Sequence, residues 1–400
     1  YTLTMLTISN KGRLMPESPI RKLVPYAERA KKNGIKVFHL NIGQPDIETP
    51  SSAIQAVKNS NIKLLAYSKS EGDFELRNKI CNYYSKINID INESQVIVTC
   101  GASEALLFTI GSIMDSGDEI IIPEPFYANY NGFSVANGVN IVPIFSSIDN
   151  NFELPKIQEF EKLISSNTKA ILICNPNNPT GYVYSYDEIK SLVEIVKKHN
   201  LFLISDEVYR EFTYDNVSHT SIMQFDDIKE HAIIIDSVSK RYSMCGARIG
   251  CIISKNSEFI STALKFAQAR LSPPTLAQIA SKAAMNTGKD YFNKVINEYN
   301  NRRKTLVEGL NKISGVKVSE PKGAFYCVVE LPVDNSEHFA KWLLEEYSLN
   351  KETVMVAPAA GFYSTPNIGQ NQVRIAYVLN QNDLKSCINI LKNGLTEYLK

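Results

Sequence analysis

The middle of the chain alternates short runs of β-branched and other apolar residues with longer stretches whose apolar positions recur with a helical period. Seven of the short runs are apolar at nearly every position, as expected for strands covered by helices on both faces. This alternation predicts an α/β fold with a mainly parallel seven-stranded sheet flanked by helices. The predicted strands are residues 96–99, 119–122, 141–144, 170–173, 202–205, 232–235 and 249–253.

Amphipathic patterns predict helices over residues 103–114 and 185–199, and Thr49 followed by Pro50 is typical of a helix whose first residue is proline. From about residue 290 the pattern changes to a long charged helix, 291–313, and then to strand-like runs at 324–331 and 373–378. A chain of 400 residues is also too long for one core. We expect a large domain over residues 49–289 and a smaller α+β domain over 290–400, joined by an N-terminal arm, 1–48, that contributes to the small domain.

The charge and the hydropathy of the chain indicate which kinds of molecule it binds. The chain has 43 basic and 42 acidic residues, and no segment gathers enough lysine or arginine for a nucleic-acid surface. No apolar run approaches the roughly 18 residues of a membrane span, and the start has no secretory apolar segment. Met5 is a plausible initiator, in which case residues 1–4 precede the native start. A small molecule is the expected substrate.

The seven cysteines are scattered and are never spaced as C-x-x-C. An odd number without paired spacing argues against a disulfide framework and against a zinc site, so we expect no bound metal. The pattern favours a reducing compartment, and we expect the protein to be cytoplasmic.

Three segments carry candidate chemistry. Residues 236–250, DSVSKRYSMCGARIG, place Lys240 just after an apolar strand, at the sheet edge where ligands bind in α/β proteins. Residues 204–209, ISDEVY, end a strand with Asp206, and residues 174–181, CNPNNPTG, form a rigid turn after another strand. Taken singly, each has an ordinary alternative: a solvated loop lysine, a carboxylate that caps the next helix, and an asparagine bonded to its own turn.

In order and spacing, these segments resemble the fold-type I pyridoxal-phosphate (PLP) enzymes. The whole chain is similar to the class I/II aminotransferases among them, most of all to bacterial aspartate aminotransferases. The resemblance implies pyridoxal 5'-phosphate as cofactor and Lys240 as the Schiff-base lysine, whose free amine later moves a proton. Asp206 resembles the carboxylate that keeps the pyridine nitrogen protonated. Tyr209 and Asn178 resemble the pair that hydrogen-bonds the cofactor's phenolic oxygen.

The resemblance also assigns a phosphate site. Residues 96–99 lead through Cys100 into a helical pattern, so amide groups at a helix N-terminus point at an anion and glycine permits its close approach. The residues implied are Gly101, Ala102, Ser103, Ser237 and Arg248. The fork of an arginine side chain suits a dianionic phosphate.

Further residues are implied for the ring and the substrate. Tyr127, in PEPFYANY, occupies the place of an aromatic ring stacked on the pyridine, and the alternative is a core tyrosine. Arg374 interrupts an apolar strand and should meet an anion, which the resemblance makes the substrate α-carboxylate; the alternative is a structural salt bridge. Gly43, in NIGQPD, resembles a glycine beside the substrate. Tyr67, in AYSKSEG, resembles a tyrosine that reaches the neighbouring subunit's cofactor, which implies a homodimer with shared active sites.

The resemblance implies ping-pong transfer of an amino group from an L-amino acid, aspartate foremost, to a 2-oxo acid such as 2-oxoglutarate. Some relatives hold the distal carboxylate with a lysine near the phosphate turn, where this chain has Ser103. Arg270, in QARLSPP, lies in a segment that approaches the neighbouring site in relatives, and we expect its replacement by leucine to weaken aspartate and glutamate turnover selectively. Alanine and aromatic substrates stay open, as does a PLP-dependent lyase on the same fold.

Two other classes are alternatives. Ser237 and Lys240 also satisfy the S-x-x-K motif of serine hydrolases, although K-T-G is absent from the chain. A ligand sensor on an aminotransferase fold would carry a DNA-binding domain, for which this chain has neither the length nor a basic patch.

Overall fold

The computed structural model describes residues 6–400, so Met5 and the residues before it lie outside the described part. A seven-stranded sheet has the order β2-β8-β7-β6-β5-β3-β4, and only β8 is antiparallel to its neighbours. The prediction of a mainly parallel sheet is therefore confirmed. Its strands are β2 (Val96–Thr99), β3 (Glu119–Glu124), β4 (Asn140–Phe145), β5 (Thr168–Cys174), β6 (Phe202–Asp206), β7 (Ala232–Ser237) and β8 (Gly250–Ile253).

The sheet is covered on both faces, which explains why its strands are apolar at nearly every position. In β5, Ala170 and Leu172 belong to the core on one face, whereas Ile171 and Ile173 belong to the core on the other. The first face is covered by α5 (Ala102–Ile113), α6 (Asn129–Asn137) and α10 (Ser257–Arg270), and the second by α4 (Phe74–Ser85), α7 (Ile157–Leu163), α8 (Tyr186–His199) and α11 (Thr275–Ala284).

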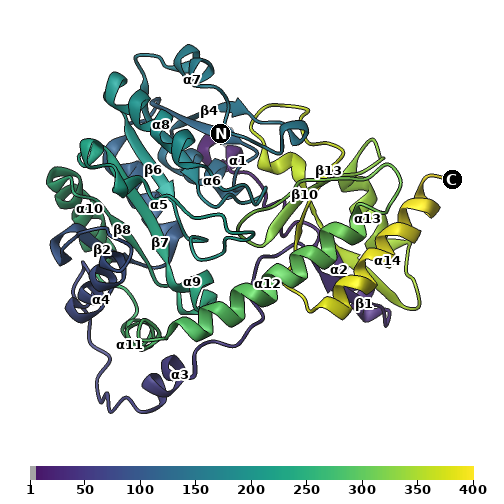
Figure 1. The fold of residues 1–400 in the computed structure, drawn as a ribbon, viewed down its shortest axis with the longest axis horizontal. Coiled ribbons are helices and arrows are strands. Elements are labelled where there is room, and N and C mark those ends of the chain that lie inside the picture. The colour runs from purple at the N-terminus through teal and green to yellow at the C-terminus, as the bar shows by residue number, and fades with distance from the viewer. Residues whose placement is uncertain (1–5) are drawn as a thin grey trace, which may run out of the picture.

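Two smaller sheets form the opposite end of the molecule, on the right in Figure 1. One pairs β1 (Lys36–His39) in parallel with β11 (Glu352–Met355), so the N-terminal segment joins the C-terminal one. The other has the order β12 (Ala357–Pro358), β13 (Gln372–Ala376), β10 (Tyr326–Glu330), β9 (Lys317–Val318) and is antiparallel. The accompanying helices are α2 (Val24–Lys32), α12 (Lys289–Leu310), α13 (Ser336–Glu345) and α14 (Gln381–Tyr398), while α1 (Asn10–Leu14), α3 (Ser51–Lys58) and α9 (Val238–Arg241) are short.

Predicted element ends differ from the observed ones where capping decides them. Helix α8 begins at Tyr186 because Ser185 is its N-cap and forms a capping box with Glu188. The expected helix start at Thr49 and Pro50 was wrong by one position. Pro50 is the N-cap of α3, while the Thr49 hydroxyl donates to the Ser243 carbonyl 2.8 Å away.

The other differences are small. The predicted helix 291–313 runs from Lys289 to Leu310, and the strand predicted over 324–331 begins at Tyr326, because Ala324 has a φ of 54°. Within residues 6–400, no helix has both the length and the apolar character that crossing a bilayer requires.

Candidate active site

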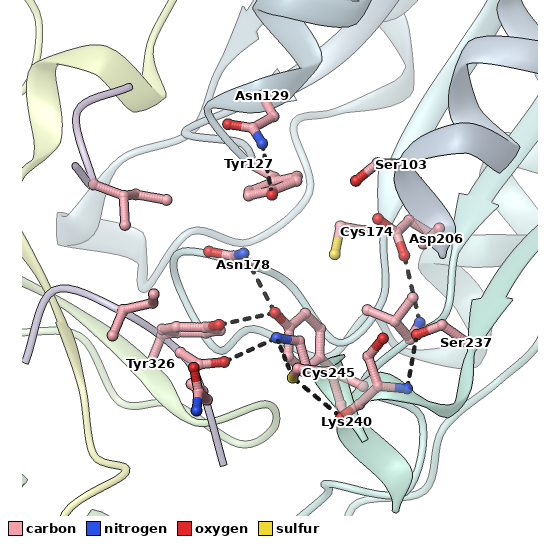
Figure 2. Close-up of a pocket in the computed structure, with 18 of the residues that line it drawn as sticks. Ser103, Tyr127, Asn129, Cys174, Asn178, Asp206, Ser237, Lys240, Cys245 and Tyr326 are labelled. Atoms are coloured by element: carbon pink, nitrogen blue, oxygen red, sulfur yellow. Dashed lines mark hydrogen bonds between the residues drawn. The ribbon is translucent and has the colours of Figure 1, made fainter. Parts of the chain in front are cut away.

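A cavity of about 550 Å³ lies at the carboxyl ends of β5, β6 and β7. Cys174, Asp206 and Ser237 end these three neighbouring strands, and all three residues line the cavity. Figure 2 shows that the other walls come from distant segments, including the phosphate-turn residue Ser103 and the small-sheet residue Tyr326. Of the residues predicted from sequence, the lining includes Gly43, Ala102, Ser103, Tyr127, Asn178, Asp206, Tyr209, Ser237, Lys240, Arg248 and Arg374.

Lys240 projects into this cavity from α9, the short helix that follows β7. Its Nζ donates a hydrogen bond to the Gly43 carbonyl at 2.8 Å and lies 3.7 Å from Cys245 Sγ. The Ser237 hydroxyl instead accepts from the Ser239 amide at 3.3 Å and caps α9. In the described chain no hydrogen bond joins Ser237 to Lys240, so the pair that a serine hydrolase requires is not formed.

Asp206 ends β6 as a buried carboxylate that forms no salt bridge within the described residues, although the charge of Lys240 acts on it from a greater distance. The Tyr130 hydroxyl donates to it at 2.8 Å, and the Val208 amide lies 3.4 Å away. Burial raises the pKa of Asp206 to about 6, although the Tyr130 hydrogen bond acts in the opposite direction. A cation bound beside Asp206 would lower this pKa again and hold the carboxylate in its charged form.

Arg374 is the other buried charge of the cavity, with a relative exposure of only 1%. It donates to Asn178 Oδ1 at 3.0 Å and to the Asn41 carbonyl, while its Nε has no hydrogen-bond partner. Since no carboxylate of residues 6–400 pairs with it, the alternative of a structural salt bridge was wrong, and burial lowers the pKa of its guanidinium. This arrangement suits a small anionic ligand that completes the arginine's hydrogen bonds.

Asn178 connects Arg374 to a pair of tyrosines. Its Nδ2 donates to the Tyr209 hydroxyl at 3.5 Å, and that hydroxyl lies 2.9 Å from the Tyr326 hydroxyl. Sequence reasoning missed Tyr326, because a tyrosine in an apolar strand matches an ordinary core position. Gly43 lies against the same side chain, and a Cβ added to Gly43 would be 1.6 Å from the Tyr326 hydroxyl oxygen. A side chain at position 43 would therefore displace this network.

The turn before α5 forms an anion cradle. Gly101 is the N-cap of α5 with a φ of 82°, a conformation that favours glycine. An added Cβ there would lie 2.4 Å from Nη2 of Arg248, so only glycine lets the guanidinium approach this turn. Arg248 donates only to two carbonyls, of Cys245 at 3.1 Å and of Cys100 at 3.4 Å, and has no carboxylate partner within residues 6–400. Helix amides and an unpaired guanidinium together suit a phosphate.

A model of the family described as aminotransferase class I and II matches residues 35–391. The chain belongs to this family. The aminotransferase is 33% identical over 394 residues to the aspartate aminotransferase of Pyrococcus horikoshii, with 97% of each chain covered. A solved aspartate aminotransferase from Thermotoga maritima superposes with a TM-score of 0.89 at 30% identity, over 97% of this chain and 100% of that one. An alanine aminotransferase from Pyrococcus furiosus gives a TM-score of 0.89 at 29% identity, over 98% and 100%.

Aminotransferases of this family use PLP, and the cavity of this enzyme fits that cofactor. It contains an amine at Lys240, a buried carboxylate at Asp206 whose pKa is raised, and the anion cradle of Gly101 and Arg248. These three features match an aldehyde, a ring nitrogen that carries a proton, and a phosphate, respectively. The family assignment excludes the serine hydrolase as a class.

Tyr127 also lines the cavity. Its hydroxyl accepts a hydrogen bond from Asn129 Nδ2 at 2.8 Å, and its ring meets that of Tyr130 edge-on, with centroids 5.5 Å apart. The same ring also packs against core residues, so Tyr127 is both a cavity-lining residue and part of the core packing. Burial raises the pKa of Tyr127 to about 12, which keeps the phenol neutral at working pH.

Three predicted residues are not part of the cavity lining of their own chain: Gly101, which caps the adjacent helix α5, and Tyr67 and Arg270, which lie farther along other segments. The Tyr67 side chain is 79% exposed, and Arg270 forms an ion pair with Glu104 at 2.5 Å. Sequence reasoning also missed lining residues. Gln44, Asn129, Cys174 and Cys245 stand within the quoted motifs but were given no role, whereas Ile20 and Arg21 lie outside all of these motifs.

Proposed function

We propose that this aminotransferase transfers the amino group of L-aspartate to 2-oxoglutarate. The observation that carries the proposal is Arg374, a buried guanidinium without a carboxylate partner in the described chain, in the same cavity as Lys240 and Asp206. A substrate with an α-carboxylate would complete its hydrogen bonds. The choice of aspartate is supported by similar enzymes named for aspartate, while the alanine aminotransferase of similar fold is the alternative.

In this proposal Lys240 would hold the cofactor through its ε-amine, which lies in the cavity. When bound, PLP supplies an aldehyde that condenses with amines and a ring that accepts electrons from the substrate carbon. Lys240 Nζ would also act as the base that takes the proton from the substrate Cα, and then as the acid that gives this proton back. The Gly43 carbonyl, 2.8 Å from that nitrogen, accepts its hydrogen bond and so orients the amine within the cavity.

The remaining residues hold and orient the reactants. Asp206 would hold the ring nitrogen of the bound cofactor in its protonated form, while Tyr209 and Asn178 would donate hydrogen bonds to its phenolic oxygen. Arg374 fixes the α-carboxylate, which sets the direction of the Cα–H bond. Tyr127, which lines the cavity, would cover one face of the cofactor ring and exclude water from it. The phosphate would be held by amides at the start of α5 (Gly101, Ala102 and Ser103), by the hydroxyls of Ser103 and Ser237, and by Arg248.

We further propose the division into a large PLP-binding domain, residues 49–289, and a small domain from residues 1–48 and 290–400. All strands of the seven-stranded sheet fall in the first part, and all strands of the two smaller sheets fall in the second. For the compartment we propose the cytoplasm, because the seven cysteines are free thiols and are not spaced for pairing.

The working unit in this proposal is a homodimer with shared active sites. The segment of Tyr67 lies against that of Leu271, since the Ser70 hydroxyl donates to the Leu271 carbonyl at 2.6 Å. Together these segments expose Leu64, Leu65, Tyr67 and Leu271, an apolar patch that a second subunit would cover. Tyr67 would then reach the phosphate of the partner's cofactor, and Arg270 would approach the partner's substrate through the same interface.

Shared sites predict complementation between inactive variants. Tyr67→Ala and Lys240→Ala chains should each have low activity, and a mixed dimer should contain one complete site, because each chain supplies what the other lacks. Refolding the two together and assaying turnover, with native mass spectrometry to count mixed dimers, checks this. Mixed dimers without any gain in turnover would show that each chain completes its own site.

The reaction itself is tested by a half-reaction. We expect aspartate alone, mixed with PLP-loaded enzyme, to yield oxaloacetate and the amine form of the cofactor, seen as loss of its visible absorbance. Stopped-flow spectra and mass spectrometry of the product measure both. Release of ammonia with the visible absorbance retained would identify a lyase and overturn the proposal. If alanine is converted faster than aspartate, alanine and not aspartate is the amino donor.

A further inference from the structure

The cavity contains more positive than negative charge. Its lining includes three arginines, Arg21, Arg248 and Arg374, together with Lys240, but Asp206 is its only carboxylate in the described chain. Under the proposed function, Arg248 faces the cofactor phosphate and Arg374 the substrate α-carboxylate. Arg21 then has no anion assigned to it, while a dicarboxylic substrate brings one further negative charge.

Arg21 is held by its backbone and not by its side chain. It lies in the turn before α2, where its amide donates to the Ser18 carbonyl at 3.0 Å and its own carbonyl accepts from the Val24 amide at 2.9 Å. Throughout residues 6–400 its guanidinium has no hydrogen bond or salt bridge, although the next residue, Lys22, pairs with Glu337. The side chain is exposed at the cavity wall, so its charge is free to meet a ligand.

The turn of Arg21 is tied to the Arg374 side of the cavity. Asn41 connects the two, since its Nδ2 donates to the Ile20 carbonyl at 2.7 Å and its own carbonyl accepts from Arg374 Nη2. Ile20 also packs in one cluster with Phe362, whose ring centroid lies 4.9 Å from the Arg374 guanidinium carbon. Arg248, in contrast, is held by the carbonyls of Cys100 and Cys245 beside the phosphate cradle.

We propose that Arg21 binds the distal carboxylate of dicarboxylic amino acids and 2-oxo acids, an assignment that rests on the proposed aminotransferase function. A ligand anchored by Arg374 at its α-carboxylate lies in a cavity that Arg21 also lines. The other sequence candidate, Arg270, is already paired with Glu104 at 2.5 Å and does not line the cavity of its chain. Position 103, where a lysine would serve, is a serine.

The test compares Arg21→Gln with Arg13→Gln, a control that removes the same charge from the same N-terminal segment but outside the cavity. For Arg21→Gln we expect the half-reaction efficiency with aspartate and glutamate to fall about tenfold or more, and that with alanine to stay unchanged. Calorimetric titration of the PLP-loaded enzyme should show the same loss of affinity for succinate but not for butyrate, independently of turnover. Melting temperatures verify that both variants fold.

Each other outcome is decisive. Equal changes for aspartate and alanine, no change for either, or an equal effect of Arg13→Gln would overturn the role of Arg21. A selective loss in Arg270→Leu without one in Arg21→Gln would move the role to Arg270. If the unmodified enzyme converts no amino acid at all, the proposed function fails instead, which the reactions of the unmodified enzyme show before any variant is compared.

Discussion

Replacing Lys240 with alanine is expected to lower kcat at least about 10³-fold, because the variant loses both the nucleophile and the proton carrier. Steady-state turnover of purified Lys240→Ala, compared with unmodified enzyme loaded with the same PLP, measures this. A second signature is rescue, since a small amine such as methylamine can enter the vacated space and carry the proton. We expect turnover of the variant to rise with methylamine concentration.

The matched control is Lys255→Ala, which removes a lysine that lies outside the cavity and pairs with Asp226. Its kcat should equal that of the unmodified enzyme, with no response to methylamine. Full turnover in Lys240→Ala would contradict the proposed role of this lysine.

Asp206→Asn is expected to have opposite effects on activity and stability. Without the carboxylate, the pyridine proton is lost and kcat should fall at least about 10²-fold. The apoprotein, however, should become more stable at pH 8, because a buried charge that forms no salt bridge within the described residues is removed. The pKa rise from 3.8 to about 6 corresponds to roughly 3 kcal/mol, an upper bound for the gain in unfolding free energy.

The pH dependence follows from the sign of that shift. Since folding raises the pKa of Asp206, protonation favours the folded state. Its contribution to stability is therefore fully present below pH 3.8, the unfolded value, and is lost as pH rises through about 6. The advantage of Asp206→Asn should accordingly be larger at pH 8 than at pH 5, which urea unfolding of the two apoproteins measures.

Asp236→Asn is the matched control, for which we expect the opposite change in stability. Asp236 is equally buried but accepts two hydrogen bonds from Arg241, at 3.0 and 2.8 Å. Its replacement leaves a buried guanidinium without full compensation and should destabilise the apoprotein by about 3–5 kcal/mol. If Asp206→Asn loses as much stability as Asp236→Asn, Asp206 has a cationic partner and the account of its raised pKa is wrong.

The sheet was predictable because burial on both faces leaves a strong signal in each strand. Residues 170–174 of β5 and 232–235 of β7 are apolar without interruption, and polar residues come directly after both runs at the cavity edge. Helix ends were less predictable, because capping depends on contacts distant in sequence. Thr49 has a typical capping side chain, yet it bonds a carbonyl 194 residues away.

Site residues could be predicted where they stand in a short local motif. The prediction failed where a residue's role depends on contacts with residues distant in sequence. Lys240, Asp206 and Asn178 stand in short motifs with conspicuous turn residues. The ion pair of Arg270 joins residues 166 apart, and the contact between Tyr209 and Tyr326 spans 117. No periodicity or spacing reveals such a pair before the chain is folded.

The central claim is a covalent bond between one lysine and the cofactor. Reduction of PLP-loaded enzyme with borohydride should fix that bond, and peptide mass spectrometry should then find the pyridoxyl phosphate group on Lys240. A group fixed on another lysine, or no fixed group in protein that binds PLP and turns over substrate, would contradict the account.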